Sequence, residues 1–372
     1  MIVLSILISI SYCVFFIWLA EGLRKSSKLK IPHVDQLPSV SIIIAARNEE
    51  ENIPKLLDAL SKLTYPEQKL EIIISNDRSS DKTEKLLRIA ENEIFNLKVI
   101  NIKSTPIDWA PKKWALQKSI EKAKNDIILQ TDADCYFNPK WVHYMVSQFN
   151  NPTVGFIAGP APTRLENSFQ DKFALMDSLA IDAVSASTLK QNIALSCVGR
   201  NIAFRKSAFF DINGYDGIQD QISGDDDLLL QKFSFSKKYS IDYIADEKSV
   251  VNSLAPQSIE EFTHQRLRFA SKGLNYYNLN TNNGLKVILP FIYIVNVFIV
   301  LSITTYTSSQ NIVWLLPYII KTGSDALLTI TFFNLLRFKW SFLAFLTLSI
   351  IHPFYVTIFA AIAPFYRIKW KS

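Results

Sequence analysis

Cysteine is scarce in this sequence and follows no metal-binding pattern. The 372 residues include only three, Cys13, Cys135 and Cys197. No Cys-x-x-Cys pair and no Cys/His set with zinc spacing occurs, which argues against a zinc module. One cysteine lies in the apolar N-terminus and the other two are far apart in sequence. A reducing, cytosolic compartment therefore fits the middle of the chain best.

Glycine-rich nucleotide motifs are also missing. No Gly-x-Gly-x-x-Gly follows the first predicted strand, which argues against an NAD-type domain. The lack of a glycine-rich phosphate loop at the same place argues against a membrane-anchored nucleotidyltransferase. No run interleaves basic with aromatic residues, so the net charge of +6 indicates a solvated surface with cytoplasmic flanks and no nucleic-acid partner.

Charge is scarce in two stretches, residues 1–20 and residues 285–366. Residues 1–20 carry none, and their length is enough to span a bilayer. A basic cluster follows this run and does not precede it, so we expect an uncleaved anchor over residues 1–22 with the next residues in the cytoplasm. The cluster consists of Arg24, Lys25, Lys28 and Lys30. The pattern predicts an integral membrane protein, as in a bacterial inner membrane, in contact with lipid.

The C-terminal region contains three apolar blocks, at residues 285–306, 312–336 and 342–365. We expect a membrane region over residues 284–366, followed by a basic tail at 367–372. If all three blocks span the membrane, that tail ends outside, against the positive-inside rule, so one block is expected to be interfacial or re-entrant. Lys321 and Asp325 share one helix face, which predicts an interior or interfacial pair, with a role in acceptor passage as the alternative.

The middle of the chain, residues 23–283, begins with alternating strands and helices. The predicted strands cover residues 40–46, 71–75, 97–102 and 126–131. The predicted helices between them cover residues 53–60, 83–93 and 114–124. Such alternation is typical of βαβ units, so we expect an α/β domain with a mostly parallel sheet. Ligands bind beyond the carboxyl ends of such strands, where Asn48, Glu49, Asp77 and Asp132 stand.

The first acidic cluster is Asp132-Ala133-Asp134 at the end of the fourth strand. Residues i and i+2 of an extended segment point the same way, so both carboxylates can face one ion. Mg²⁺ and Mn²⁺ prefer such oxygen ligands and keep positions for phosphate oxygens. Two surface aspartates are the alternative, but the place after an apolar strand favours a metal that neutralises a departing diphosphate.

The second acidic cluster is Asp225-Asp226-Asp227, after Gly224. Adjacent carboxylates repel one another, which raises pKa values where they are partly buried and suits a general base for an acceptor hydroxyl. An acidic helix N-terminus is the other interpretation, and the two are compatible because the apolar residues that follow predict a buried helix.

A third cluster, Gln265-Arg266-Leu267-Arg268-Phe269, is basic and aromatic. Arg268 can bind a diphosphate through paired hydrogen bonds, and Phe269 can form an apolar platform for an acceptor sugar ring. Taken alone, the segment is also typical of a basic helical face near a membrane.

In this order, the clusters resemble the family 2 glycosyltransferases with a GT-A fold, over about residues 38–275. Residues 40–50 are similar to the opening strand and its Asn-Glu signature, and residues 111–116 to a Gly-Lys-x-x-Ala-Leu segment with Pro111 in place of glycine. Asp77 matches the nucleoside contact, Asp225-Asp226 a Glu-Asp pair with Asp226 as the base, and residues 265–269 the Gln-x-x-Arg-Trp motif of membrane-embedded members. Residues 199–201, followed by Gly214 and Tyr215, resemble the acceptor-side region.

The resemblance implies roles for individual positions. The donor-binding residues would be Ala45, Asn48, Glu49, Asp77, Lys112, Asp132 and Arg268. The acceptor-binding residues would be Asn201, Gln265 and Phe269. Asp134 with Asp132 would hold the metal, and Asp226 with Asp225 would be catalytic. The sequence departs from the family pattern in three ways that bear on the site: Phe269 replaces tryptophan, Asn76 replaces aspartate and Asp225 replaces glutamate. None of these changes removes a required chemical type.

The expected function is inverting transfer of a sugar from a nucleotide-diphosphate sugar to a lipid-linked or polysaccharide acceptor. UDP as the nucleotide and inversion at the sugar carbon are implied by the resemblance alone. The alternative is a non-catalytic nucleotide-sugar-binding subunit of a glycan export assembly, against which the intact Asp132, Asp134 and Asp226 argue. Processive synthesis and single transfer both stay open.

Overall fold

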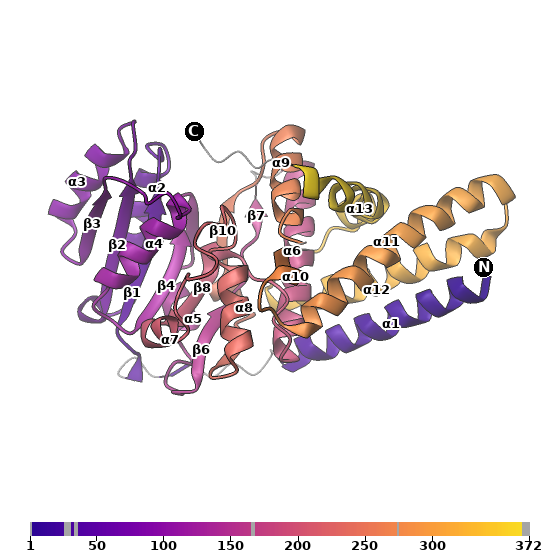
Figure 1. Ribbon diagram of the computed structural model, residues 1–372, viewed down its shortest axis with the longest axis horizontal. Helices are drawn as coiled ribbons and strands as arrows, with labels where there is room; N and C mark the ends of the chain where they lie inside the picture. Colours follow the sequence, from indigo (N-terminus) through magenta and orange to yellow (C-terminus); the bar gives the residue numbers. More distant parts are fainter. Residues whose placement is uncertain (1, 26–30, 33–35, 165–167, 274, 367–372) are drawn as a thin grey trace. The chain divides into compact units, whose positions relative to one another are not determined.

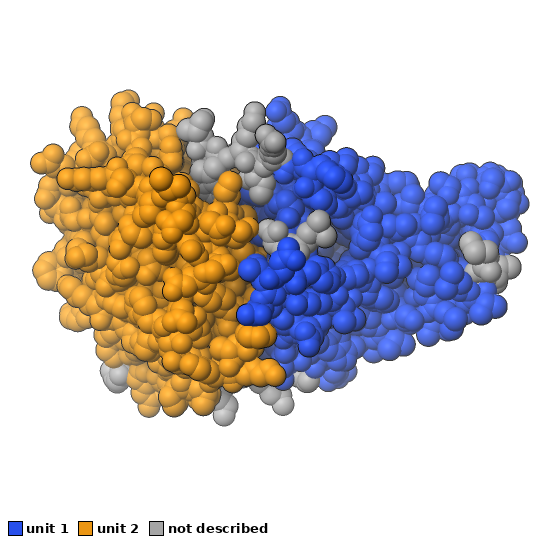
Figure 2. Space-filling model, viewed as in Figure 1, with its two compact units in different colours: residues 1–27, 163–195, 255–372 blue, residues 28–162, 196–254 orange. Residues whose placement is uncertain are grey.

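The computed structural model describes residues 2–25, 31–32, 36–164, 168–273 and 275–366. The chain forms two compact units, coloured separately in Figure 2. Unit 1 comprises residues 1–27, 163–195 and 255–372, and unit 2 comprises residues 28–162 and 196–254. The predicted basic tail at 367–372, and Lys28 and Lys30 of the predicted basic cluster, lie outside the described residues.

Unit 2 is built on a seven-stranded, mostly parallel sheet (Figure 1). Its strands are β1 (Val40–Ala46), β2 (Leu70–Asp77), β3 (Leu97–Ile102), β4 (Ile127–Asp132), β6 (Val154–Ala158), β8 (Ile202–Arg205) and β9 (Ser240–Tyr243). Their order is β3-β2-β1-β4-β8-β6-β9. The first four are parallel, β8 is antiparallel to both of its neighbours, and β6 and β9 are parallel. The predicted α/β class is thereby confirmed.

The central strands are buried on both faces, as expected for a parallel sheet covered by helices. Ile42, Ile44, Ile72, Ile74 and Leu129 belong to one apolar core. Helices α2 (Ile53–Ser61), α3 (Thr83–Glu93) and α4 (Pro111–Lys122) follow the first three strands, and α4 packs against the sheet. Proline stands in the first turn of both α2 and α4, where a missing backbone N–H costs nothing.

The register of the sheet brings three strand ends to one edge. Ala45 of β1 lies opposite Ser75 of β2 on one side and Asp132 of β4 on the other. The carboxyl ends of β1, β2 and β4 therefore end level with one another, as the sequence predicts. The remaining elements of unit 2 are β5 (Cys135–Phe137) paired antiparallel with β10 (Val251–Leu254), α5 (Trp141–Met145), α7 (Lys206–Asp211), α8 (Asp227–Ser236), and the 3-10 helices η2 (Glu67–Lys69), η3 (Gly199–Asn201) and η4 (Glu247–Ser249).

Unit 1 is mainly helical. It contains α1 (Ile2–Lys25), the short β7 (Thr163–Arg164), α6 (Phe169–Lys190), α9 (Ile259–Ala270), α10 (Asn275–Asn278), α11 (Asn283–Ser309), η5 (Ile312–Leu315), α12 (Leu316–Leu335), α13 (Phe342–Ile362) and η6 (Ala363–Phe365). Helix α1 runs along α12 and also packs on α6, while α13 packs on α6, α9 and α11 (Figure 1). Gly22 makes the α1–α6 approach possible, because a Cβ there would lie 2.5 Å from the Ser187 carbonyl oxygen.

The described residues contain three helices that are long and apolar enough to cross a membrane. One is N-terminal, Val3–Arg24, and two lie in the C-terminal region, Asn283–Ser309 and Phe342–Phe365. The middle C-terminal block forms α12, which is not among them and carries the predicted pair, with Lys321 Nζ 2.5 Å from Asp325 Oδ2. The division of the chain into membrane and cytoplasmic segments stays a prediction.

Candidate active site

The loops that follow β1 and β2 are joined by hydrogen bonds through predicted donor-binding residues. Asn48 Oδ1 accepts a hydrogen bond from the Ser80 amide at 2.9 Å, and the Asn48 amide donates to Ser79 Oγ at 3.1 Å. The Glu49 amide donates to Thr83 Oγ1 at 2.7 Å. Asn48 also adopts a left-handed backbone with φ of 53°, which asparagine tolerates better than most residues. Both residues thus shape the rim next to Asp77 through contacts within the protein.

Asp77 lies at the end of β2 and is only 3% exposed. Arg78 Nε lies 2.8 Å from its Oδ1 atom, while the nearest guanidinium nitrogen of Arg47 is 3.9 Å from Oδ2, beyond hydrogen-bond length. This carboxylate lies at the strand edge, flanked by Arg47 and Arg78, and its contact with a nucleoside stays a prediction. Ala45 lies inside β1 between Ser75 and Asp132, so it contributes backbone to the same edge.

Lys112 joins the two acidic clusters. Its Nζ lies 2.8 Å from Asp132 Oδ1 and 3.1 Å from Asp225 Oδ2. Burial would lower the pKa of Lys112, but the negative charges of Asp132, Asp225 and Asp226 outweigh it, so the pKa is raised above its ordinary value and the ammonium stays charged. Residues 93 positions apart in sequence, Asp132 and Asp225, therefore belong to one site.

Asp226 is held in place by two backbone N–H groups. As the N-cap of α8, its Oδ1 accepts from the Asp227 amide at 2.6 Å, and its Oδ2 accepts from the Gly199 amide at 2.8 Å. A carboxylate offers about four acceptor positions, so this anchoring is compatible with uptake of a proton. The cap and the predicted base are therefore the same residue.

Gly199 allows the close packing of this cluster. A Cβ on Gly199 would lie 3.0 Å from Asp225 Oδ2 and 3.3 Å from Asp226 Cβ. Gln130, buried in β4, donates from Nε2 to the Gly199 carbonyl and to Asp225 Oδ2, both at 3.0 Å. Sequence reasoning missed Gln130, although a lone amide in the otherwise apolar start of β4 is a usable signal.

Lys113 anchors the loop that precedes Asp225. It is buried, and its ammonium donates to the carbonyls of Ile218, Gln221 and Ser223 at 2.6, 2.8 and 3.1 Å. Sequence reasoning missed this residue as well. The adjacent lysines of α4 thus have different contacts: Lys112 binds carboxylates of the site, and Lys113 fixes the loop that precedes Asp225.

The donor set suits a metal ion shared with a substrate. Among the described residues, no group of three or more His, Cys, Asp or Glu side chains could hold an ion by itself. Asp132 and Asp134 supply two carboxylates, and Mg²⁺ is usually bound through one or two carboxylates together with water and substrate phosphates. Cys135 Sγ lies 3.6 Å from Asp134 Oδ1, and burial, with the charges of Asp134 and Asp132, raises the pKa of this thiol.

Asn201 does not suit its predicted acceptor role. It is fully buried, its Oδ1 accepts from Trp141 Nε1 at 2.9 Å, and its Nδ2 donates to the carbonyls of Pro160 and Ser249 at 2.7 and 2.8 Å. Both Nδ2 hydrogens are thereby engaged within the protein. Asn201 thus links the segment after β6 to α5 and η4, and the acceptor role stays a prediction that these contacts argue against.

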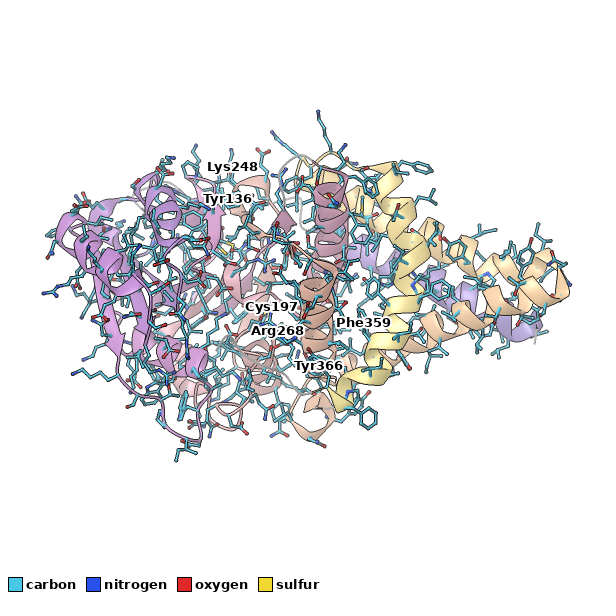
Figure 3. The ribbon with its side chains drawn as sticks, turned by 90° about the horizontal axis from the view of Figure 1, so that it is seen from above. Tyr136, Cys197, Lys248, Arg268, Phe359 and Tyr366 are labelled. Carbon is cyan, nitrogen blue, oxygen red and sulfur yellow. The ribbon has the colours of Figure 1, made fainter. Side chains whose placement is uncertain are left out.

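The remaining predicted residues, Gln265, Arg268 and Phe269, lie on α9 in unit 1. The structure therefore brings Lys112, Asp132, Asp225 and Asp226 together in unit 2 and places the third cluster in the other unit. Figure 3 labels Arg268 on α9, Phe359 on α13 and Tyr366 directly after η6; α9 packs against both α13 and η6. The Phe269 ring is 39% exposed, and the guanidinium of Arg268 lies 5.5 Å from its centre.

Comparison with solved structures defines the fold class. The chain is similar to the mannosyltransferase PcManGT from Pyrobaculum calidifontis, solved in complex with GDP-Man and Mn²⁺. The TM-score is 0.61 with 16% sequence identity, and the match covers 98% of this chain and 99% of the other. At that identity the likeness shows the fold, which is the predicted GT-A type.

Sequence comparison gives the family. Residues 41–212 match the family described as Glycosyl transferase family 2. Residues 127–366, more than half of the chain, match the family described as Glycosyl transferase family group 2. The chain belongs to the family 2 glycosyltransferases, as the motifs predict.

Two named relatives are staphylococcal. The chain is 27% identical over 263 residues to a poly-beta-1,6-N-acetyl-D-glucosamine synthase of Staphylococcus aureus, and 26% identical over 262 residues to that of Staphylococcus epidermidis. Each match covers 70% of this chain and 60% of the relative, so the chain spans less than two thirds of the relatives' length.

Proposed function

We propose that this protein transfers a sugar from a nucleotide-diphosphate sugar, with UDP as the nucleotide, to a glycan or lipid-linked glycan acceptor. The observation that carries the proposal is the single cluster in which Lys112 bridges Asp132 of the predicted metal motif and Asp225 of the predicted catalytic pair. The staphylococcal relatives, named as synthases of an N-acetylglucosamine polymer, support a polysaccharide product.

In the proposed reaction, Asp77 binds the base or ribose of the donor at the end of β2. Asp134, with Asp132, holds a Mg²⁺ or Mn²⁺ ion that, when bound, neutralises negative charge on the diphosphate. Lys112 adds a second positive charge at the same place. Arg268 as a further diphosphate contact stays a prediction.

The chemical step is a direct displacement at the anomeric carbon. The acceptor hydroxyl oxygen forms the new glycosidic bond, the bond from the anomeric carbon to the diphosphate oxygen breaks with its electron pair, and the sugar configuration inverts. Asp226 accepts the hydroxyl proton, and its two backbone hydrogen bonds keep the carboxylate oriented for that transfer. Asp225 lies beside Lys112 and fixes its ammonium between both clusters.

We also propose that the protein is integral to the membrane, with unit 2 on the cytoplasmic side. The three helices of spanning length and the basic residues after the first of them support this assignment. In soluble form such helices would expose many large apolar side chains, such as Val3, Ile294 and Ile350, which are 70%, 57% and 51% exposed.

A donor panel tests the function. The full chain in detergent is incubated with UDP- and GDP-sugars and Mn²⁺ or Mg²⁺, and nucleotide release is measured with and without membrane lipid and glycan acceptors. We expect metal-dependent release from one donor, abolished by Asp134→Ala and by Asp226→Asn. Asp58→Asn is the matched control, since it removes a carboxylate from an exposed pair with Lys62. Donor binding without turnover by the wild type would instead identify a non-catalytic nucleotide-sugar-binding subunit.

A further inference from the structure

Unit 1 contains a buried ionic contact that joins three helices. Asp177 of α6 is 2% exposed, and its Oδ2 pairs with the guanidinium of Arg266 on α9. Its other oxygen, Oδ1, accepts a hydrogen bond from the Tyr355 hydroxyl of α13 at 2.8 Å. Both carboxylate oxygens are therefore used, one for each partner helix.

Buried ion pairs are poor sources of stability, because desolvation of the two charges offsets their attraction. Apolar side chains of similar volume could hold α6, α9 and α13 together equally well, and most of α13 is apolar. What an ion pair adds is a defined orientation, since the planar guanidinium of Arg266 must face the Asp177 carboxylate. A side chain packed against this guanidinium depends on that orientation.

The neighbour is Phe269, one helical turn further along α9. The guanidinium carbon of Arg266 lies 5.6 Å from the centre of the Phe269 ring and 5.0 Å from that of Phe262. Side chains at i+3 and i−4 flank the same helix face, so Arg266 is held between the two rings. A phenylalanine has no ring N–H with which to fix its own orientation, so this ring takes its position from the groups packed on it, which also include Arg268 and Lys272.

We infer that Asp177 and Tyr355 are positioning residues for acceptor binding: through Arg266 they set the orientation of the exposed Phe269 ring. The inference rests on the proposed function, because Phe269 is the acceptor contact there. It accounts for the contact of a carboxylate, a guanidinium and a tyrosyl hydroxyl where α6, α9 and α13 meet. The three residues do not touch the reacting atoms, and their effect on turnover passes through Phe269.

The same unit supplies a matched control. Tyr12 of α1 donates its hydroxyl to Asp325 Oδ1 of α12 at 2.7 Å, and Asp325 pairs with Lys321. Tyr355→Phe and Tyr12→Phe thus delete the same group, a hydroxyl bonded to an ion-paired aspartate, which is buried in the case of Asp177 and half-buried in the case of Asp325. Only Asp177, the partner of Tyr355, also pairs with a residue of α9.

The test compares Tyr355→Phe, Asp177→Asn and Tyr12→Phe in the full chain in lipid nanodiscs. Steady-state kinetics give KM for donor and acceptor, and nucleotide release without acceptor reports donor chemistry alone. We expect about a five- to tenfold rise in acceptor KM for Tyr355→Phe and a larger rise for Asp177→Asn. Donor KM and acceptor-independent release should stay within twofold of wild type, and Tyr12→Phe should change none of these values.

A second readout needs no activity. With 4-fluorophenylalanine incorporated at position 269, the ¹⁹F resonance should shift in Asp177→Asn and Tyr355→Phe and stay unchanged in Tyr12→Phe. An unchanged resonance and an unchanged acceptor KM in both Asp177→Asn and Tyr355→Phe would overturn the inference. Equal loss of donor and acceptor binding in all three variants would also overturn it, because that result indicates a general packing role. If the wild type releases no nucleotide, the proposed function fails, and the resonance alone decides the positioning role.

Discussion

Lys112 is the residue whose replacement tests the site most directly. We expect Lys112→Met, which keeps the length of the side chain and removes its charge, to impair both folding and turnover. At an effective dielectric constant of about 20, unit charges at roughly 3 Å attract by about 5 kcal/mol, most of which desolvation offsets. Removal of one partner from a buried pair lowers the free energy of unfolding by about 3–5 kcal/mol. We expect a loss of about 2–3 kcal/mol here, because the Asp132 side chain is 29% exposed.

The turnover of Lys112→Met should fall by more than the loss of folding stability alone would cause. Lys112 supplies preorganised positive charge where the diphosphate leaves, and loss of one such group typically lowers kcat by about 10²–10³-fold. The variant should also bind Mn²⁺ more tightly without donor, because no ammonium competes for Asp132. Nucleotide release, thermal unfolding and Mn²⁺ titration followed by electron paramagnetic resonance measure the three effects.

Lys112→Arg is the control that keeps the charge. It should retain most of the stability and lose part of the turnover, because the guanidinium is wider than the ammonium that fits between Asp132 and Asp225. Wild-type turnover and Mn²⁺ affinity in Lys112→Met would refute the reasoning, since they would mean that the bridge between the two acidic clusters has no part in donor chemistry.

Three further substitutions probe the groups around this bridge. Gly199→Ala should lower kcat at least about tenfold with little change in donor KM, because the added methyl meets Asp225 Oδ2 at 3.0 Å; unaltered kcat would contradict this. Lys113→Met should lower the free energy of unfolding by about 3 kcal/mol in a denaturant titration, since one buried and two part-buried carbonyls lose their donor; a loss below about 1 kcal/mol would exclude the anchoring role. Asn201→Ala should lower thermal stability and leave acceptor KM unchanged, whereas a raised acceptor KM in a fully folded variant would restore the acceptor role that the structure argues against.

Much of the fold could be predicted because local patterns agree with the tertiary context. The strands at 40–46 and 97–102 and the helix at 83–93 have the predicted bounds, since each apolar run ends at a polar turn. Beyond residue 132 the signal weakens: β8 is only four residues long, and its antiparallel pairing with β4 and β6 depends on contacts distant in sequence. No local period encodes such pairing.

The start of α4 shows why part of the site escaped prediction. The sequence predicts this helix from residue 114, but it begins at Pro111, so Lys112 and Lys113 fall in its first turn. Lysine is unfavourable there, because the helix dipole places positive charge at the N-terminus. The carboxylates of Asp132 and Asp225 and the carbonyls around Lys113 compensate for that penalty, and none of them is near in sequence. Only the folded chain shows both the compensation and the role.

Asp226 shows that two competing interpretations of one motif can describe a single physical arrangement. A base must keep its oxygens aimed at the acceptor hydroxyl, and a flexible aspartate would lose that aim to rotation about its side-chain bonds. The N-cap geometry removes this freedom, because the Asp227 and Gly199 amides each hold one oxygen. Helix α8 is in turn fixed to the sheet through its contacts with β6 and β9. The packing of α8 on the sheet therefore fixes the orientation of the proposed base. A substitution that breaks the hydrogen bond of either the Asp227 or the Gly199 amide should reduce turnover even if Asp226 itself is intact.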